Sequence, residues 1–306
     1  MPGARGVRYD ARSMTLTFGA LLLVIACSFA WGGCDLSRKL LAGKIRPMPL
    51  VVLLTLGAVP LFLLWILIDG MPVVKPSYWA PALTSVALNI GANLAFFVAL
   101  RSSALSVAIP LLSLTPVFAT LLAIPLLGQQ PTGLQGLGIL LVMAGAIALS
   151  LPEDGSLAPA AVWQAWRSDH NILWMVLVAL CWSLAVPFDK LSMEQASGPL
   201  HGLVLNAGVG GAVAVVLLAR GRTGELGDVR KAPLVFLFGL LVSALALGLQ
   251  LIAIQRVWVS LVETLKRGIE NALAVVLGRQ VFREVVTVRK LTAVGLMVVG
   301  VALILM

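Results

Sequence analysis

Residues 48–69 read MPLVVLLTLGAVPLFLLWILID and carry no charged side chain before Asp69. About 20 such residues in a helix are long enough to cross the hydrocarbon core of a bilayer. Similar apolar runs recur along the chain, and continuous runs of this length favour helices over a membrane barrel. Windows of about 20 residues predict ten spans, at residues 14–36, 48–69, 77–100, 103–128, 132–151, 171–191, 199–219, 232–254, 258–281 and 288–306.

Composition points to the same class of protein. Of the 306 residues, 60% are apolar and 11% are charged, and the mean hydropathy is +1.02. A soluble domain needs about a quarter of its residues charged, so a soluble globular protein is excluded. The net charge of +9 comes from basic residues in short gaps between apolar runs, as in loops that touch lipid headgroups. No basic face indicates a nucleic-acid partner.

The chain shows signs of an internal duplication. The longest polar stretch, residues 152–170, falls at the midpoint and reads as a linker. Cys27 and Asp35 match Cys181 and Asp189 at an offset of 154 residues (181 − 27 and 189 − 35). At an offset of 155, three further pairs match: Arg101 with Arg256, Thr132 with Thr287, and Gly145 with Gly300. Because five spans are an odd number, the second copy enters from the opposite side, which predicts an inverted repeat.

Two stretches of the chain resemble a known family. The run from Ala104 to Phe118, ALSVAIPLLSLTPVF, followed by Leu127-Gly128 and by Met143 to Ala146, resembles the fourth and fifth helices of EamA-type members of the drug/metabolite transporter superfamily. Leu277-Gly278 and Phe282-Arg283-Glu284, then Gly295 and Gly300, resemble the second copy. The resemblance implies a carrier for small metabolites. Gln129 and Gln130 replace the acidic residue usual after the fourth helix, whereas Glu284 keeps it.

We therefore expect an all-α integral membrane fold of ten transmembrane helices, arranged as a five-plus-five inverted repeat. Residues 1–151 form the first EamA-like repeat, 152–170 the linker and 171–306 the second repeat. The expected location is the bacterial plasma (inner) membrane. The distribution of basic residues puts both termini outside, whereas the resemblance implies cytoplasmic termini, so the orientation stays open.

The most informative residues lie inside the run 258–281. Glu263, Lys266, Arg267 and Glu270 follow the i, i+3, i+4, i+7 spacing and share one helix face with zero net charge. Four such charges facing lipid would cost on the order of 10 kcal/mol, so they are expected to face the protein interior. There Glu263 can reach Arg267, and Lys266 can reach Glu270. The stripe either binds a substrate with charged groups or is a structural ladder of ion pairs.

Several uncharged side chains are candidates for the same substrate site. Asn89 and Asn93 are four residues apart in the third span, and Gln250 lies in the eighth. Their amides either bind a polar metabolite or join helices to one another. Trp31 either covers a substrate or anchors the first span at the membrane interface.

Asp35 and Asp189 occupy equivalent ends of the first and sixth spans. They either gate access and exchange protons, or are interfacial carboxylates paired with Lys39 and Lys190. Proton coupling through a carboxylate of the ninth span is a further expectation.

The sequence indicates no cofactor and no metal. His170 and His201 are the two histidines, and neither belongs to a cluster with metal-ligand spacing. No phosphate-binding loop is present, so we expect gradients rather than ATP to drive transport. The prediction is a secondary transporter, an exporter or exchanger of small polar metabolites such as amino acids. The alternative is an integral-membrane lipid-processing enzyme or a non-transporting accessory protein. The sequence leaves the oligomeric state unknown.

Overall fold

The structure, a computed structural model, describes residues 17–42, 44–102, 114–150, 171–283 and 286–305. The predicted linker at residues 152–170 lies outside the described residues. So do Glu284 and most of the stretch, from Ala104 to Ser113, that carries the family resemblance.

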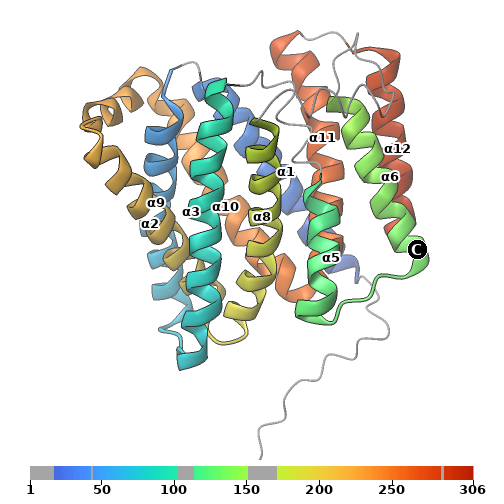
Figure 1. Cartoon of the computed structure of the whole chain (residues 1–306), viewed down its shortest axis with the longest axis horizontal. Coiled ribbons are helices and arrows are strands. Elements are labelled where there is room, and N and C mark those ends of the chain that lie inside the picture. Colours follow the sequence, from blue (N-terminus) through green and yellow to red (C-terminus); the bar gives the residue numbers. More distant parts are fainter. Residues whose placement is uncertain (1–16, 43, 103–113, 151–170, 284–285, 306) are drawn as a thin grey trace, which may run out of the picture.

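The described residues form a bundle of helices (Figure 1). The longer helices are α1 (Phe18–Ala42), α2 (Pro47–Asp69), α3 (Trp79–Ser102), α5 (Thr115–Leu127), α6 (Gly133–Ser150), α8 (Asn171–Met193), α9 (Gly198–Ala219), α10 (Pro233–Arg256), α11 (Val259–Phe282) and α12 (Val288–Leu305). Two short 3-10 helices, η1 (Pro76–Tyr78) and η2 (Thr223–Lys231), lie in connections. Among the described residues, six helices are long and apolar enough to cross a membrane, and α5 and α6 are shorter apolar helices. The protein is therefore a multi-pass integral membrane protein.

The first helix is longer than its predicted span. Hydropathy ends the span at residue 36, but α1 continues to Ala42. Hydropathy reports contact with lipid, whereas a helix continues through polar residues as long as its backbone hydrogen bonds are made. Asp35 and Arg38 therefore lie on α1 itself and form an ion pair one turn apart, with 3.4 Å between Nη1 and Oδ1.

Connections group at two ends of the bundle. At one end, which we call the Asp189 end, the Lys75 amide donates to the Gln195 carbonyl at 3.1 Å. At the opposite end, the Asp35 end, Arg46 before α2 pairs with Glu225 of η2. Arg222 also donates to Glu225 at 2.7 and 3.0 Å, and these hydrogen bonds, with those from Arg46, hold the pKa of the Glu225 carboxyl below its ordinary range.

Helix contacts follow the order of the two halves. We match the helices of the two halves in chain order: α1 with α8, α2 with α9, α3 with α10, α5 with α11 and α6 with α12. The main contacts between two helices then have a counterpart between the helices matched to them. The packing of α3 on α8 matches that of α1 on α10, and α5 on α8 matches α1 on α11. The helices α2 with α9, and α6 with α12, pack on their own counterparts.

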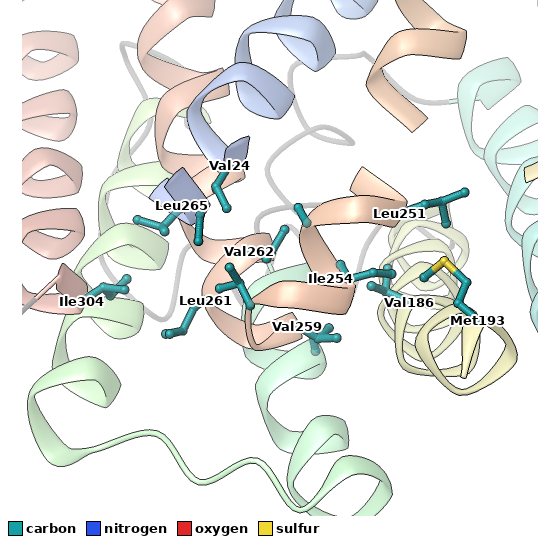
Figure 2. Close-up of a cluster of buried hydrophobic side chains, with 14 of the residues drawn as sticks. Val24, Val186, Met193, Leu251, Ile254, Val259, Leu261, Val262, Leu265 and Ile304 are labelled. Atoms are coloured by element: carbon teal, nitrogen blue, oxygen red, sulfur yellow. The ribbon is translucent and has the colours of Figure 1, made fainter. Parts of the chain in front are cut away.

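The main apolar core surrounds the start of α11 (Figure 2). Leu251 and Ile254 of α10 pack with Val259, Val262 and Leu265 of α11. Side chains of other helices complete this cluster: Val24 of α1, Val186 and Met193 of α8, and Ile304 of α12. Moving each of these side chains from water into the core stabilises the fold by about 1.5 to 3 kcal/mol. The gain is smaller for a side chain that would otherwise face lipid. The cluster fixes the rotation of α11 about its axis, and with it the face that carries the charged stripe.

Glycines bring α6 and α12 into backbone contact. A Cβ atom added at Gly138 would lie 2.5 Å from the Gly300 carbonyl oxygen, and one added at Gly145 would lie 2.6 Å from the Ala293 carbonyl oxygen. Increasing residue number on α6 meets decreasing number on α12, so the two helices are antiparallel. The repeat also relates the two contacts to each other. An offset of 155 residues takes Gly145 to Gly300 and Gly138 to Ala293, so each contact becomes the other. Small residues of this kind are what allow close packing of membrane helices.

We predict that Gly138→Ala and Gly300→Ala each lower the thermal stability of the purified protein. Each added methyl group would meet backbone atoms, and overpacking of this kind costs about 1 to 3 kcal/mol. The matched controls are Gly136→Ala on α6 and Gly295→Ala on α12, where a Cβ meets nothing within 4 Å. The measurement is thermal unfolding in detergent. Equal melting temperatures for the control and test variants would contradict the prediction.

Candidate functional site

The charged stripe of α11 is inside the protein, as the sequence predicts. Glu263, Lys266 and Glu270 are buried, with 3%, 6% and 7% of each residue exposed, and Arg267 is partly buried. The interleaved residues Val262 and Leu265 belong to the apolar core. Between Val259 and Glu270, the polar and apolar faces of α11 are thus both covered by other helices, mainly α1, α5, α6 and α12.

The helix begins where Gln129 caps it. The N-cap residue Trp258 offers no side-chain acceptor, and the Gln129 side-chain oxygen accepts the Val259 amide hydrogen at 3.0 Å. The first amides of a helix lack partners within the helix, so this bond satisfies one of them. Gln129 therefore has a structural role at the start of the site helix.

Lys266 is the centre of the first group of contacts. Its Nζ donates to Glu263 Oε1 at 2.7 Å and to Gln250 Oε1 at 3.1 Å. The same ammonium lies 5.4 Å from the centroid of the Trp31 ring, within the range of a cation–π interaction. Four predicted site residues, contributed by α1, α10 and α11, therefore meet at one point.

The second ion pair is looser. Arg267 Nη1 lies 3.4 Å from Glu270 Oε2, and the Arg267 side chain is 19% exposed. The sequence-based pairing of Glu263 with Arg267 and of Lys266 with Glu270 is wrong in this structure, since both pairs are formed at i, i+3. Both spacings place side chains on one helix face, so the spacing alone does not choose between them.

Three buried nitrogen atoms around these pairs lack hydrogen-bond partners: Trp31 Nε1, Arg267 Nε and Asn271 Nδ2. Asn271 lies one turn beyond Arg267 and eight residues after Glu263, so it continues the same face of α11. All three atoms are donors. A buried donor without a partner costs about 1 to 3 kcal/mol, so a site of this kind is completed by a molecule rich in acceptors, either water or a ligand.

Asn89 and Asn93 do not join this group by hydrogen bonds among the described residues. Asn89 Nδ2 donates to the Ser85 carbonyl at 3.0 Å, and Asn93 Nδ2 donates to the Asn89 carbonyl at 2.7 Å. Both amide nitrogens therefore bond back to α3 itself. Side chains that bond one turn back along a helix are common in apolar surroundings, and the sequence does not distinguish them from ligand-binding amides.

The two equivalent aspartates have different environments. Asp35 has a side chain 56% exposed beside Arg38. Asp189 is 5% exposed, and its Oδ1 accepts from Ser85 Oγ and lies 2.8 Å from His201 Nε2. The His201 Nδ1 atom is 3.2 Å from the hydroxyl of Tyr78.

Sequence reasoning missed this chain of polar side chains. From the sequence, His201 was assigned to no cluster and Tyr78 was not selected, yet both are fully buried. One signal was present: Asp189 and His201 lie six residues on either side of Gln195, in the turn between α8 and α9. Positions equidistant from the turn of a helical hairpin face each other, so these two residues were candidates for a pair.

Comparisons with known proteins agree with this architecture. The EamA-like transporter family matches residues 17–151 and, a second time, residues 171–306. No curated protein matches the sequence. A protein crystal structure aligns over 93% of this chain and 96% of its own, with a TM-score of 0.73 and 18% sequence identity, so the two share a fold. With both copies of the family matched over nearly the whole chain, the protein belongs to the EamA-like transporter family and is a membrane transporter of the drug/metabolite transporter superfamily.

Proposed function

We propose that the protein is a secondary transporter, an exporter or exchanger, of small polar metabolites such as amino acids and related zwitterionic or anionic compounds. The observation that supports this most is the set of unpartnered buried donors beside the two ion pairs of α11. A substrate carboxylate supplies several acceptor lone pairs and suits Arg267, Trp31 and Asn271.

Charge balance favours a substrate of the same kind. Glu263, Lys266, Arg267 and Glu270 sum to zero, so a zwitterion enters without leaving a net charge inside the membrane. Its ammonium group has Glu270 or Glu263 as a partner, and the Trp31 ring offers a face to an apolar moiety. A purely lipophilic cation would require carboxylates that are not already paired with Lys266 and Arg267.

We further propose the full architecture as ten spans in two inverted repeats, residues 1–151 and 171–306 joined by 152–170, with the substrate cavity between the halves. The contact between α6 and α12 supports this architecture. The repeat relates these two helices to each other, and they run antiparallel. A two-fold axis that relates antiparallel helices lies perpendicular to them, as in an inverted repeat. The expected setting is the bacterial inner membrane, and the expected activity is transport without chemical change of the substrate.

We predict that Lys266→Met and Arg267→Met each reduce counterflow of a zwitterionic substrate in proteoliposomes by about 30-fold or more. Each change removes the anion's counter-charge and leaves a buried carboxylate unpaired, which costs at least about 2 kcal/mol. Lys231→Met is the matched control, because Lys231 pairs with Asp228 in η2 with 60% of its side chain exposed.

Size-exclusion chromatography checks folding of each variant. If both variants fold and show normal counterflow, the charged stripe is only a structural ladder of ion pairs. The proposed substrate class then loses its support. If both variants misfold, the exchanged pair Glu263→Lys with Lys266→Glu keeps one cation and one anion at the same two positions. We expect that variant to fold and to bind the substrate poorly, since the anion partner has moved by one turn.

We predict that a proton gradient drives accumulation of the substrate through Glu263 or Glu270. Substrate binding to the basic residues releases a carboxylate, which then takes up a proton. In at least one of Glu263→Gln and Glu270→Gln, an imposed pH gradient should no longer drive accumulation, while counterflow at equal pH continues. Gradient-driven accumulation that persists in both variants would exclude coupling at these carboxylates.

A further inference from the structure

A polar seam at the Asp189 end joins two separate parts of the bundle. One part is η1 with the start of α3, and the other is the hairpin of α8 and α9. Four contacts cross the seam. Two are hydrogen bonds to Gln195. The Lys75 amide donates to its backbone carbonyl at 3.1 Å, and Ser77 Oγ donates to its side-chain oxygen at 2.9 Å. The other two link Ser85 to Asp189 and Tyr78 to His201.

The inner two contacts form one continuous hydrogen-bonded chain. With a neutral imidazole, Tyr78 donates to His201 Nδ1, while His201 Nε2 and Ser85 donate to the Asp189 carboxylate. Every donor is then used, but the buried group carries one negative charge. A proton added to His201 converts the imidazole to imidazolium, which leaves the pair neutral, and Nδ1 then donates to the Tyr78 oxygen. Burying a net charge is costly in a membrane interior, so the closed seam is more stable with the proton bound.

Among the described residues, the opposite end of the bundle lacks this arrangement. At the 154-residue offset, Asp189 corresponds to Asp35, but the counterparts of Ser85, Tyr78 and His201 are Gly239, Ala232 and Pro47. Asp35 is exposed beside Arg38 rather than sealed. The polar chain thus distinguishes one end of the bundle from the other.

We propose that the Asp189–His201 pair is a proton-binding site that operates a gate at the Asp189 end of the bundle. With the proton bound, η1 and α3 stay closed on the α8–α9 hairpin. Loss of the proton to water leaves a buried aspartate beside a neutral histidine, and the seam opens to hydrate it. The gate rests on the proposed transport function, whereas the proton site does not depend on the substrate.

Other charged groups lie on the elements around the pair, and solvent screens the field of those that are exposed. Lys190 follows Asp189 directly and interacts electrostatically with Glu194. The other charged residues of the described elements at this end of the bundle are Lys75 before η1, Asp69 at the end of α2 and Arg256 at the end of α10. Histidine is the side chain that ordinarily changes charge between about pH 5 and 8, so the pair is tested in that range.

The test measures how exposed Cys181 is to a membrane-impermeant thiol reagent. This half-buried residue lies with Ala92 and Ala95 between α3 and α8, about 12 Å deeper than Asp189 along the helix. Cys27 and Cys34 are replaced by alanine in the full-length protein. At each pH, the labelling rate is divided by the rate for Cys181 in detergent-unfolded protein. This ratio removes the pH dependence of the labelling reaction itself and leaves the effect of exposure.

We expect the normalised rate to rise severalfold as the pH increases from about 5 to 8. His201→Gln keeps the negative charge and should label fast at every pH, whereas Asp189→Asn removes it and should label slowly at every pH. Asp69→Asn, an exposed carboxylate at the same end, is the matched control and should behave like the parent. A rate without pH dependence in the parent, or the same pH dependence in all variants, would overturn the proton site.

A second measurement covers variants that fail to fold. In a cysteine-free background, Ser77→Cys with Gln195→Cys places a disulfide across the seam. Oxidation should abolish counterflow and reduction should restore it. Full counterflow in the oxidised protein would overturn the gate. If the parent shows pH-dependent labelling but no counterflow of any zwitterion, the proposed transport function fails and the proton site stands.

Discussion

The cost of placing charge inside a membrane constrains the structure more than any other interaction. Helix α11 carries two acidic and two basic side chains within eight residues, and the fold pairs each base with an acid one turn away. Removing one partner from such a pair is far more costly than never having the pair. The apolar core around α11 sets the rotation of this helix, and Gln129 caps its first turn. Together they keep these charges away from lipid.

Sequence reasoning identified the family, the all-helical class and the face of α11 that turns inward. These depend on long apolar runs and on the 3.6-residue period, which act over many residues and tolerate local exceptions. It did not identify the i, i+3 pairing, because two spacings satisfy the same face. It also did not identify the self-bonded amides of Asn89 and Asn93, or the burial of His201. Those features depend on which helices meet, and no single segment encodes that.

The two copies have the same framework but different side chains. At the 155-residue offset, the counterparts of Glu263, Lys266, Arg267 and Glu270 are Ala108, Leu111, Leu112 and Thr115. The charged stripe therefore belongs to the second copy alone, as does His201. A duplicated fold supplies two equivalent positions for each side chain, and here the second copy alone carries the charged stripe and the buried histidine, while Trp31 and Tyr78 of the first copy contact them.

The glycine contact between α6 and α12 has a mechanical consequence. Where backbone lies directly on backbone, the atoms in contact cannot move aside by a change of rotamer, so the helices resist sliding. One helix comes from each copy, so this corner is a stiff joint between the two halves. Any rocking of one half against the other must pivot about it, and the largest displacements then fall on the helices farthest from that pivot, α2, α3 and α9 (Figure 1).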